Sequence, residues 1–285
     1  MEKEEKEKEE KEKEKEKEKE KEVFKVGKKN GILYFENIHS YETRNDSTFK
    51  CIEEANKIYQ WNDFEITVHT GDTCEEDEYG YSKNSLFRLV PDFNFDAWPQ
   101  VGIRDYTETV QEIKRVGSFP AQLLKVGWIG NTDTNIMRKN LILYGQKCPR
   151  LFDIIDMKWI QTKNTQLNAT KFLSMSELVK RYAILIDIEG YGYSGRLKHL
   201  LWSQRPLLLV DRPHKEYFFE NLKEWEHYIP VKRDLSDLLT KTIWCMKNMK
   251  QSKQIANNAL KFSEKYLTRE ACYSKWNEII TNIQR

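Results

Sequence analysis

The chain has 285 residues, enough for one large domain or two small ones, and a formal net charge of +2 at pH 7. Its first 22 residues are Met1 followed only by lysine and glutamate, and they hold 9 of the 47 basic and 12 of the 45 acidic residues. The remaining 38 basic and 33 acidic side chains give a net charge of +5, weaker than the basic surface of a nucleic-acid-binding domain. We therefore expect no nucleic-acid partner.

No apolar run approaches the roughly 20 residues of a membrane span, and the sequence shows no secretory or ER-retrieval signal. We expect no membrane span and a cytoplasmic location. The five cysteines are widely spaced and the five histidines form no HxH or HExxH pair, which predicts free thiols and no metal or other cofactor. Asp187 and Glu189 imitate the acidic pair of some metal-dependent sugar-nucleotide enzymes, but they follow a buried strand and make a poor metal site.

Glutamate and lysine nearly alternate in residues 10–22. On a helix this spacing sets repulsion at i,i+4 against attraction at i,i+3, and the two effects largely cancel. We expect residues 1–22 to be a disordered, solvated tail. Such a tail is a tether, a solubility segment, or a repeat expansion without a role.

Residues 23–118 show short strand and helix patterns. We expect, in chain order, a hairpin, a helix, two strands, an aromatic loop bounded by prolines and a second helix, at residues 23–41, 48–60, 64–69, 85–90, 91–99 and 107–116. The first of the two strands ends in the sharp turn Thr70-Gly71-Asp72. A carboxylate at a strand end could act as a general base, and the alternative is an ordinary turn aspartate.

Residues 119–240 alternate strand and helix at short spacing, which predicts a mostly parallel α/β sheet. The expected strands are 123–129, 182–187 and 206–210, and the expected helices are 135–144, 174–181, one that starts at Ser194, 215–222, 234–249 and 254–283. Ser174 and Glu177 form a capping-box pattern. Parallel sheets bind ligands at the carboxyl ends of their strands, so the turns at Asp72, Gly130 and 190–196 are candidate sites.

The most informative segment is Tyr193-Ser194-Gly195-Arg196, which follows a buried strand and a glycine turn. Ser194 could cap the next helix and donate to a phosphate oxygen, and Arg196 could hold a diphosphate through two hydrogen bonds. The alternative is a plain N-cap serine and a surface arginine. Gly130, Asn131 and Arg138 offer a second anion-binding turn, or an ordinary strand-to-helix turn.

Residues 182–239 resemble glycosyltransferase family 90, which includes protein O-glucosyltransferases of the Rumi type and capsule-associated xylosyltransferases. Two strings carry the resemblance, GYGYSGRLKHL at residues 190–200 and LKEWEHYIPVKRDLSDL at residues 222–238. Weaker matches extend it through most of residues 60–285.

The resemblance implies a GT-B fold, in which two Rossmann-like domains face each other across a cleft. Residues 23–118 would be a trimmed acceptor-side domain and residues 119–285 the nucleotide-sugar-binding domain, with terminal helices that pack back. The activity implied is an inverting, metal-independent transfer of a hexose or pentose from a UDP-sugar to a hydroxyl of a protein or glycan.

Site residues are implied position by position. Asp72 would be the catalytic base. The nucleotide-sugar would be bound by Gly130, Asn131, Arg138, Gly192, Tyr193, Ser194 and Arg196. The aromatic loop would supply an acceptor or sugar platform at Phe95, Asp96 and Trp98, unless these residues pack in the core.

Three departures from the family pattern keep a second function open. Ile129 stands where many members have an arginine, Gly195 stands where a large residue is common, and the region before Asp72 is short. The alternative is an inactive family member that serves as a carbohydrate- or protein-binding module.

Overall fold

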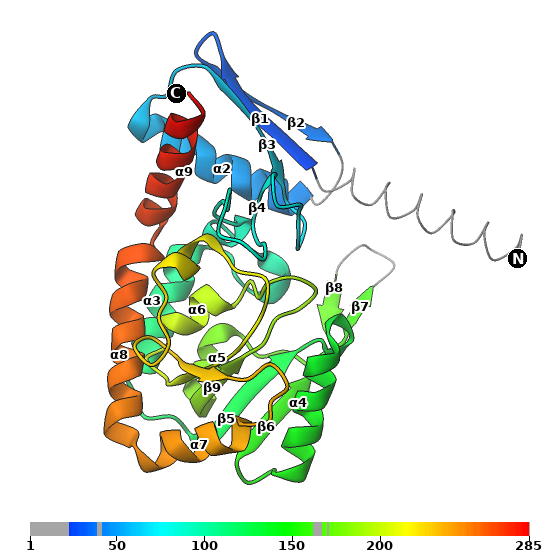
Figure 1. Cartoon of the computed structure of the whole chain (residues 1–285), viewed down its shortest axis with the longest axis vertical. Helices are drawn as coiled ribbons and strands as arrows, with labels where there is room; N and C mark the ends of the chain where they lie inside the picture. The colour runs from blue at the N-terminus through cyan, green and yellow to red at the C-terminus, as the bar shows by residue number, and fades with distance from the viewer. Residues whose placement is uncertain (1–22, 39–41, 162–166, 170, 285) are drawn as a thin grey trace, which may run out of the picture.

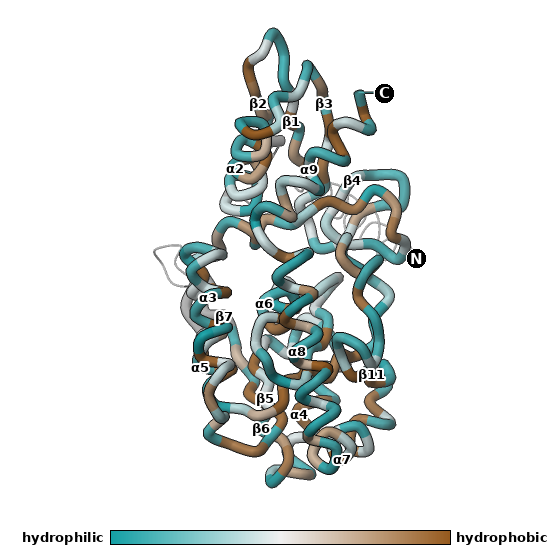
Figure 2. The backbone as a smooth tube through the Cα atoms, turned by 90° about the vertical axis from the view of Figure 1, so that its left-hand side faces the viewer, coloured by the Kyte–Doolittle hydropathy of each residue, from teal (hydrophilic) through white to brown (hydrophobic). Residues whose placement is uncertain are grey.

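The computed structural model describes residues 23–38, 42–161, 167–169 and 171–284 (Figure 1). The tail predicted at residues 1–22 lies outside the described residues. Two sheets lie at opposite ends of an elongated molecule, each with hydrophobic segments in its strands (Figures 1 and 2). Within the described residues, no helix is both long and apolar enough to cross a membrane.

The N-terminal sheet has four strands in the order β2-β1-β3-β4. They are β1 (Val23–Lys29), β2 (Ile32–Ile38), β3 (Phe64–His69) and β4 (Tyr79–Gly80). β1 pairs antiparallel with both β2 and β3, and β3 pairs parallel with β4. A Rossmann-like sheet is mostly parallel, so the expectation of such a sheet in residues 23–118 is wrong. Asn30 and Gly31, with φ of 53° and 79°, form a two-residue hairpin turn that forces antiparallel pairing.

Helix α2 (Glu42–Tyr59) packs beside this sheet and begins before the helix predicted at 48–60. Residues 85–90, predicted as a strand, contribute only one bridge, from Leu89 to Gly80, because Arg88 has a left-handed backbone with φ of 51°. The aromatic loop contains two 3-10 turns, η1 (Phe93–Phe95) and η2 (Pro99–Val101), and leads into α3 (Tyr106–Gly117).

The C-terminal half contains the predicted parallel sheet, with five strands in the order β11-β10-β9-β5-β6. They are β5 (Leu123–Gly130), β6 (Phe152–Asp156), β9 (Tyr182–Asp187), β10 (Leu207–Val210) and β11 (Ile229–Val231), all paired parallel. β9 and β10 are buried almost throughout, as their apolar runs predict. A small antiparallel hairpin of β7 (Trp159–Gln161) and β8 (Leu167–Ala169) follows β6.

The helices of this half partly match the prediction. α4 (Ile136–Lys147) connects β5 to β6, and α5 (Met175–Arg181) opens with the predicted capping box. Two other helix predictions are wrong. The helix expected to start at Ser194 is the short α6 (Leu197–Leu201), and residues 215–222 hold only the 3-10 turn η4 (Tyr217–Glu220).

The C-terminal helices are α7 (Leu238–Lys247), α8 (Met249–Tyr266) and α9 (Arg269–Ile283). The single helix expected at 254–283 is thus two, since the Thr268 hydroxyl caps α9 by accepting a hydrogen bond from the Ala271 N–H. α9 returns to the N-terminal half and packs along α2 (Figure 1). The Trp61 indole N–H donates to the Asn277 side chain at 2.8 Å across this contact.

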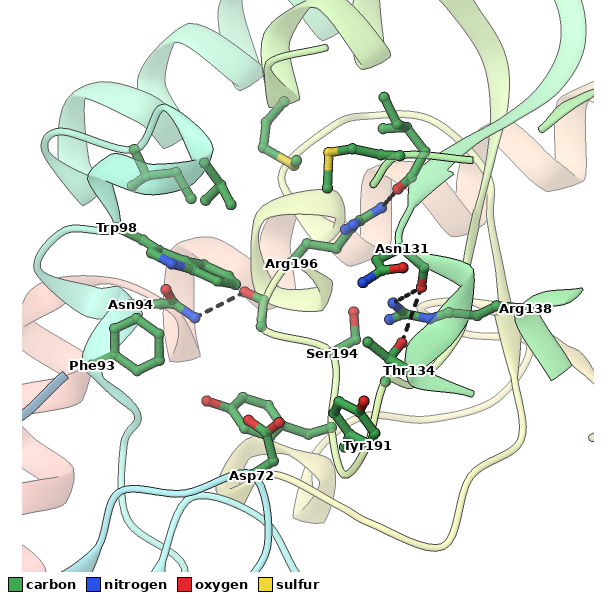
Figure 3. A pocket seen from close by; sticks show the side chains of 18 of the residues that line it. Asp72, Phe93, Asn94, Trp98, Asn131, Thr134, Arg138, Tyr191, Ser194 and Arg196 are labelled. Carbon is green, nitrogen blue, oxygen red and sulfur yellow. Dashed lines mark hydrogen bonds between the residues drawn. The ribbon is translucent and has the colours of Figure 1, made fainter. Parts of the chain in front are cut away.

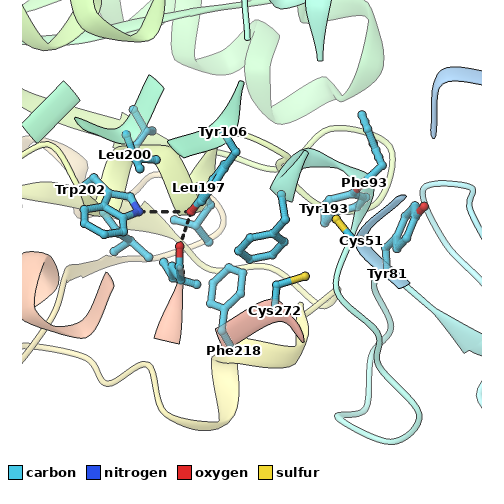
Figure 4. Close-up of a cluster of buried hydrophobic side chains, with 14 of the residues drawn as sticks. Cys51, Tyr81, Phe93, Tyr106, Tyr193, Leu197, Leu200, Trp202, Phe218 and Cys272 are labelled. Carbon is cyan, nitrogen blue, oxygen red and sulfur yellow. Dashed lines mark hydrogen bonds between the residues drawn. The ribbon is translucent and has the colours of Figure 1, made fainter. Parts of the chain in front are cut away.

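One hydrophobic core runs through both halves. Figure 4 shows Tyr81 and Phe93 of the N-terminal half beside Tyr193 of the C-terminal half, and the rings of Tyr81 and Tyr193 are 6.3 Å apart. The Tyr106 hydroxyl donates to the Leu267 carbonyl at 2.6 Å and accepts from the Trp202 indole at 3.2 Å. The shared core therefore fixes the two halves relative to each other.

Candidate active site

A pocket of about 440 Å³ lies between the two halves, beyond the carboxyl ends of β3, β5 and β9 (Figure 3). This is where a parallel sheet is expected to bind its ligand. Seven of the predicted site residues line the pocket: Asp72, Trp98, Asn131, Arg138, Tyr193, Ser194 and Arg196. The prediction missed six other lining residues whose side chains are polar or aromatic: Arg44, Phe93, Asn94, Thr134, Phe172 and Tyr191.

Gly130 and Gly192 were predicted to contact the nucleotide-sugar, but they lie behind the pocket wall. A Cβ atom on Gly130 would lie 2.6 Å from the Trp128 ring, and one on Gly192 would lie 2.0 Å from the carbonyl oxygen of Asp72. Both positions therefore need glycine for close packing. At Gly192 that packing brings the loop after β9 against the turn after β3.

Asp72 follows β3 and reaches the pocket from the N-terminal half. Its carboxylate is about one third exposed and forms an ion pair of 3.1 Å with Arg44. The Ser82 hydroxyl donates to the Asp72 backbone carbonyl at 2.7 Å. The turn is thus held from three sides, by Arg44, Ser82 and Gly192, while the carboxylate stays accessible to a ligand.

The guanidiniums of Arg138 and Arg196 both lie over the Trp128 ring, at 5.5 Å and 5.7 Å from its centre. Burial, with the nearby charge of Arg196, lowers the pKa of Arg138 to about 9, and burial also lowers the pKa of Arg196. In the described part of the chain, no carboxylate forms an ion pair with either guanidinium. Two cations without a paired anion, on one pocket wall, favour an anionic ligand.

The two arginines are held differently. Arg138 donates to three backbone carbonyls, those of Asn131 at 2.9 Å, Ile188 at 3.2 Å and Glu189 at 2.8 Å. Arg196 has one such bond, to the carbonyl of Ile129. Arg138 therefore braces the turns after β5 and β9, and Arg196 keeps more of its donors for a ligand.

Ser194 does not cap α6, because Arg196 occupies the N-cap position. Its hydroxyl instead donates to the buried carboxylate of Asp187 at 2.7 Å, and the other oxygen of Asp187 pairs with Arg212 at 2.8 Å. The predicted hydroxyl bond from Ser194 to a phosphate is thus replaced by a bond inside the protein. The α6 helix is also too short to add much dipole.

Phe95 and Asp96, predicted as part of a sugar platform, are turned away from the pocket. The Phe95 ring is buried and packs on Tyr106 and Tyr217, and the Asp96 carboxylate pairs with Lys50 at 2.8 Å and Arg269 at 3.3 Å. Of the predicted platform, Trp98 alone lines the pocket.

A buried ionic cluster lies under the pocket floor. The ammonium of Lys198 contacts the carboxylates of Asp92 at 2.8 Å and Glu216 at 3.5 Å, and all three side chains are almost fully buried. Asp92 also accepts from Asn94, whose amide donates to the Gly195 carbonyl. Burial raises the pKa of Glu216 to about 8. The cluster ties the aromatic loop to the Ser194–Arg196 segment.

No group of three or more His, Cys, Asp or Glu side chains converges as a metal site among the residues that the structure describes. Asp187 and Glu189, the acidic pair considered from the sequence, are instead paired with Arg212 and Arg233.

The fold and the pocket together define an α/β protein whose pocket between the halves is lined by Arg138, Arg196 and the carboxylate of Asp72. The family model of glycosyl transferase family 90 matches residues 5–284, nearly the whole chain, and the chain belongs to this family.

Individual relatives are more distant. The chain is 30% identical over 139 residues to "Protein O-glucosyltransferase 3" of Rattus norvegicus, covering 45% of this chain and 27% of that protein. It is 28% identical over 177 residues to "O-glucosyltransferase rumi" of Drosophila pseudoobscura pseudoobscura, covering 59% of this chain and 42% of that protein. The matches thus span 27% and 42% of the length of these relatives. Among solved structures, the match to the crystal structure of TarM covers 56% of this chain and 36% of the TarM chain, with 14% identity and a TM-score of 0.39.

Proposed function

We propose that the protein is an inverting glycosyltransferase that moves a hexose or pentose from a UDP-sugar to an acceptor hydroxyl. The observation that carries the proposal is the pair of guanidiniums, Arg138 and Arg196, that line the pocket without a carboxylate partner in the described residues. A diphosphate supplies the anion that this wall lacks. The relatives named as O-glucosyltransferases support a sugar as the transferred group.

Asp72 lies on the other side of the pocket from Arg196 (Figure 3). In the proposed reaction, the acceptor hydroxyl gives its proton to the Asp72 carboxylate as its oxygen attacks the anomeric carbon of the sugar. The bond from that carbon to the UDP oxygen breaks, and UDP leaves with its negative charge toward Arg196 and Arg138. Attack and departure on opposite faces of the sugar invert the anomeric configuration.

The guanidiniums also support a mechanism in which no metal ion is needed, since fixed cations neutralise the leaving diphosphate. We further propose that the two halves correspond to the facing domains of a GT-B fold. The acceptor-side domain is then reduced to a four-stranded mixed sheet with α2. The pocket between the halves and the return of α9 to α2 support this assignment.

Calorimetry with UDP and a panel of UDP-sugars, paired with an assay of UDP release in the presence and absence of EDTA, tests the proposal. We expect UDP and at least one UDP-sugar to bind, and the wild-type protein to release UDP with EDTA present. Asp72→Asn should bind UDP as the wild type does and lose turnover. Full turnover in Asp72→Asn would reject Asp72 as the base. A wild-type protein that binds UDP but shows no turnover would instead support the binding-module alternative.

A further inference from the structure

Tyr191 is an aromatic residue of the pocket that the proposed mechanism does not use. It stands between Gly190 and Gly192 in the loop after β9, its side chain is 70% exposed, and it lines the pocket. Figure 3 shows it on the same side of the pocket as Asp72, and its neighbour Gly192 packs against the Asp72 backbone. Among the described residues, no hydrogen bond, ion pair or ring contact engages the Tyr191 side chain.

The backbone on both sides of Tyr191 is firmly held. The Asn135 side chain donates to the Gly190 carbonyl at 3.0 Å, and the Gly190 N–H donates to the Tyr193 carbonyl at 3.2 Å. On the other side, Gly192 packs so closely on the Asp72 carbonyl that no side chain fits between them. An exposed ring is therefore presented from a fixed backbone, which lowers the entropy lost when a ligand covers it.

A second ring faces the same space from the N-terminal half. Trp98 lines the pocket, packs edge to face on Phe93 with centroids 5.4 Å apart, and has its ring edge against Gly195, where a Cβ atom would lie 3.1 Å away. In Figure 3, Asp72 lies between the Trp98 side and the Tyr191 side of the cavity. An acceptor hydroxyl that reaches Asp72 therefore enters a pocket that both rings line.

We propose that Tyr191 is a specificity-determining residue that stacks on a sugar ring of the acceptor, so that the acceptor is a saccharide. The inference rests on the proposed function. A pyranose offers an apolar C–H face to an aromatic ring and hydroxyls at its edge, and tyrosine offers a flat face and a hydroxyl with no partner among the described residues. The ion-paired side chains of Arg44 and Asp72, which line the same pocket, offer polar groups to such a hydroxyl-rich ligand.

Initial rates with a saccharide panel and a panel of serine-containing peptides, at saturating UDP-sugar, test this inference in the full chain. Tyr191→Ala should raise KM for the preferred saccharide about tenfold, and Tyr191→Phe, which keeps the ring, should raise it less than threefold. Neither should change the Kd for UDP or the KM for the UDP-sugar. Phe119→Ala removes a ring of similar exposure that lies in the loop between α3 and β5, outside this pocket, and serves as the matched control.

The inference is overturned if Tyr191→Ala leaves the saccharide KM unchanged, if it weakens UDP binding instead, or if only peptides are glycosylated. The proposed function is tested separately by UDP-sugar binding and hydrolysis without an acceptor. If Tyr191→Ala binds the UDP-sugar and transfers to saccharides as the wild type does, only the inference about Tyr191 is rejected. A wild-type protein that binds no UDP-sugar removes both.

Discussion

The guanidinium of Arg44 lies 3.1 Å from the carboxylate of Asp72, and the pair joins the first turns of α2 to the turn after β3. Arg44 also donates to the Thr70 carbonyl at 2.9 Å and lies over the Phe93 ring at 5.1 Å from its centre. The guanidinium is therefore held by backbone and aromatic contacts that do not involve the carboxylate. It can fix the orientation of Asp72 while one third of that side chain stays open to the pocket.

Arg44→Gln should lower kcat at least tenfold, because the Asp72 carboxylate loses the contact that orients it. The KM for the proposed UDP-sugar should stay within twofold of the wild type, since Arg44 lies in the half that we propose to be the acceptor side. The free energy of unfolding should fall by roughly 1–3 kcal/mol, because the ion pair, the bond to the Thr70 carbonyl and the contact with the Phe93 ring are all lost. Arg44→Lys keeps the charge and should recover part of kcat, whereas equal kcat in Arg44→Gln and the wild type would show that Asp72 needs no such support.

We expect substitutions of Arg138 and Arg196 to change different properties, the free energy of unfolding for Arg138 and the affinity for UDP for Arg196. Arg196→Ala should weaken UDP binding by roughly 1.5–3 kcal/mol, the range for hydrogen bonds to a charged group, and leave the melting temperature nearly unchanged. Arg138→Ala removes three bonds to buried carbonyls and should lower the free energy of unfolding by about 2–4 kcal/mol. Calorimetry with UDP and urea unfolding of both variants separate the two roles. A stability loss in Arg196→Ala as large as that in Arg138→Ala would contradict the division.

The sequence predicted three strands of the parallel sheet, β5, β9 and β10, because buried strands leave clear apolar runs such as Tyr182–Asp187. It missed β6, which contains two aspartates, and β11, which has only three residues. It failed where tertiary contacts decide. Phe95 and Trp98 look equivalent in an aromatic loop, and only the turn at 93–95 buries the first and leaves the second at the pocket. Arg44 precedes the apolar pattern of its helix, so no local signal marks it. Lys198 is hidden for a similar reason, since its carboxylate partners are far away in sequence.

Gly192→Ala tests the close approach of the two halves beside Asp72. The added Cβ would lie 2.0 Å from the Asp72 carbonyl oxygen and 2.8 Å from Thr73, so the backbone must move. We expect a loss of roughly 1–3 kcal/mol in the free energy of unfolding, as for overpacked cores, and a drop in kcat as the Asp72 turn is displaced. Gly31→Ala is the control. There a Cβ meets nothing within 4 Å but φ is +79°, so stability should fall while turnover per folded molecule stays the same.

His199 gives the structure a defined sensitivity to acid. Its side chain is fully buried against Tyr106 at a ring distance of 5.3 Å, and burial together with the charge of Lys198 lowers its pKa to about 3. The unfolded chain binds a proton near pH 6.5, whereas the folded protein resists it until about pH 3. The stability contributed by neutral His199 is therefore complete above pH 6.5 and is lost as the pH falls through this window.

Urea unfolding of the wild type between pH 7 and pH 4 should show this loss, with His199 contributing a slope of at most about 1.4 kcal/mol per pH unit. His199→Gln and His199→Phe cannot take up the proton, so the difference in unfolding free energy between wild type and variant should shrink as the pH falls. Carboxylates that titrate in the same range contribute equally to all three proteins and cancel in that difference. A difference that stays constant from pH 7 to pH 4 would mean that His199 does not set the acid sensitivity of this core.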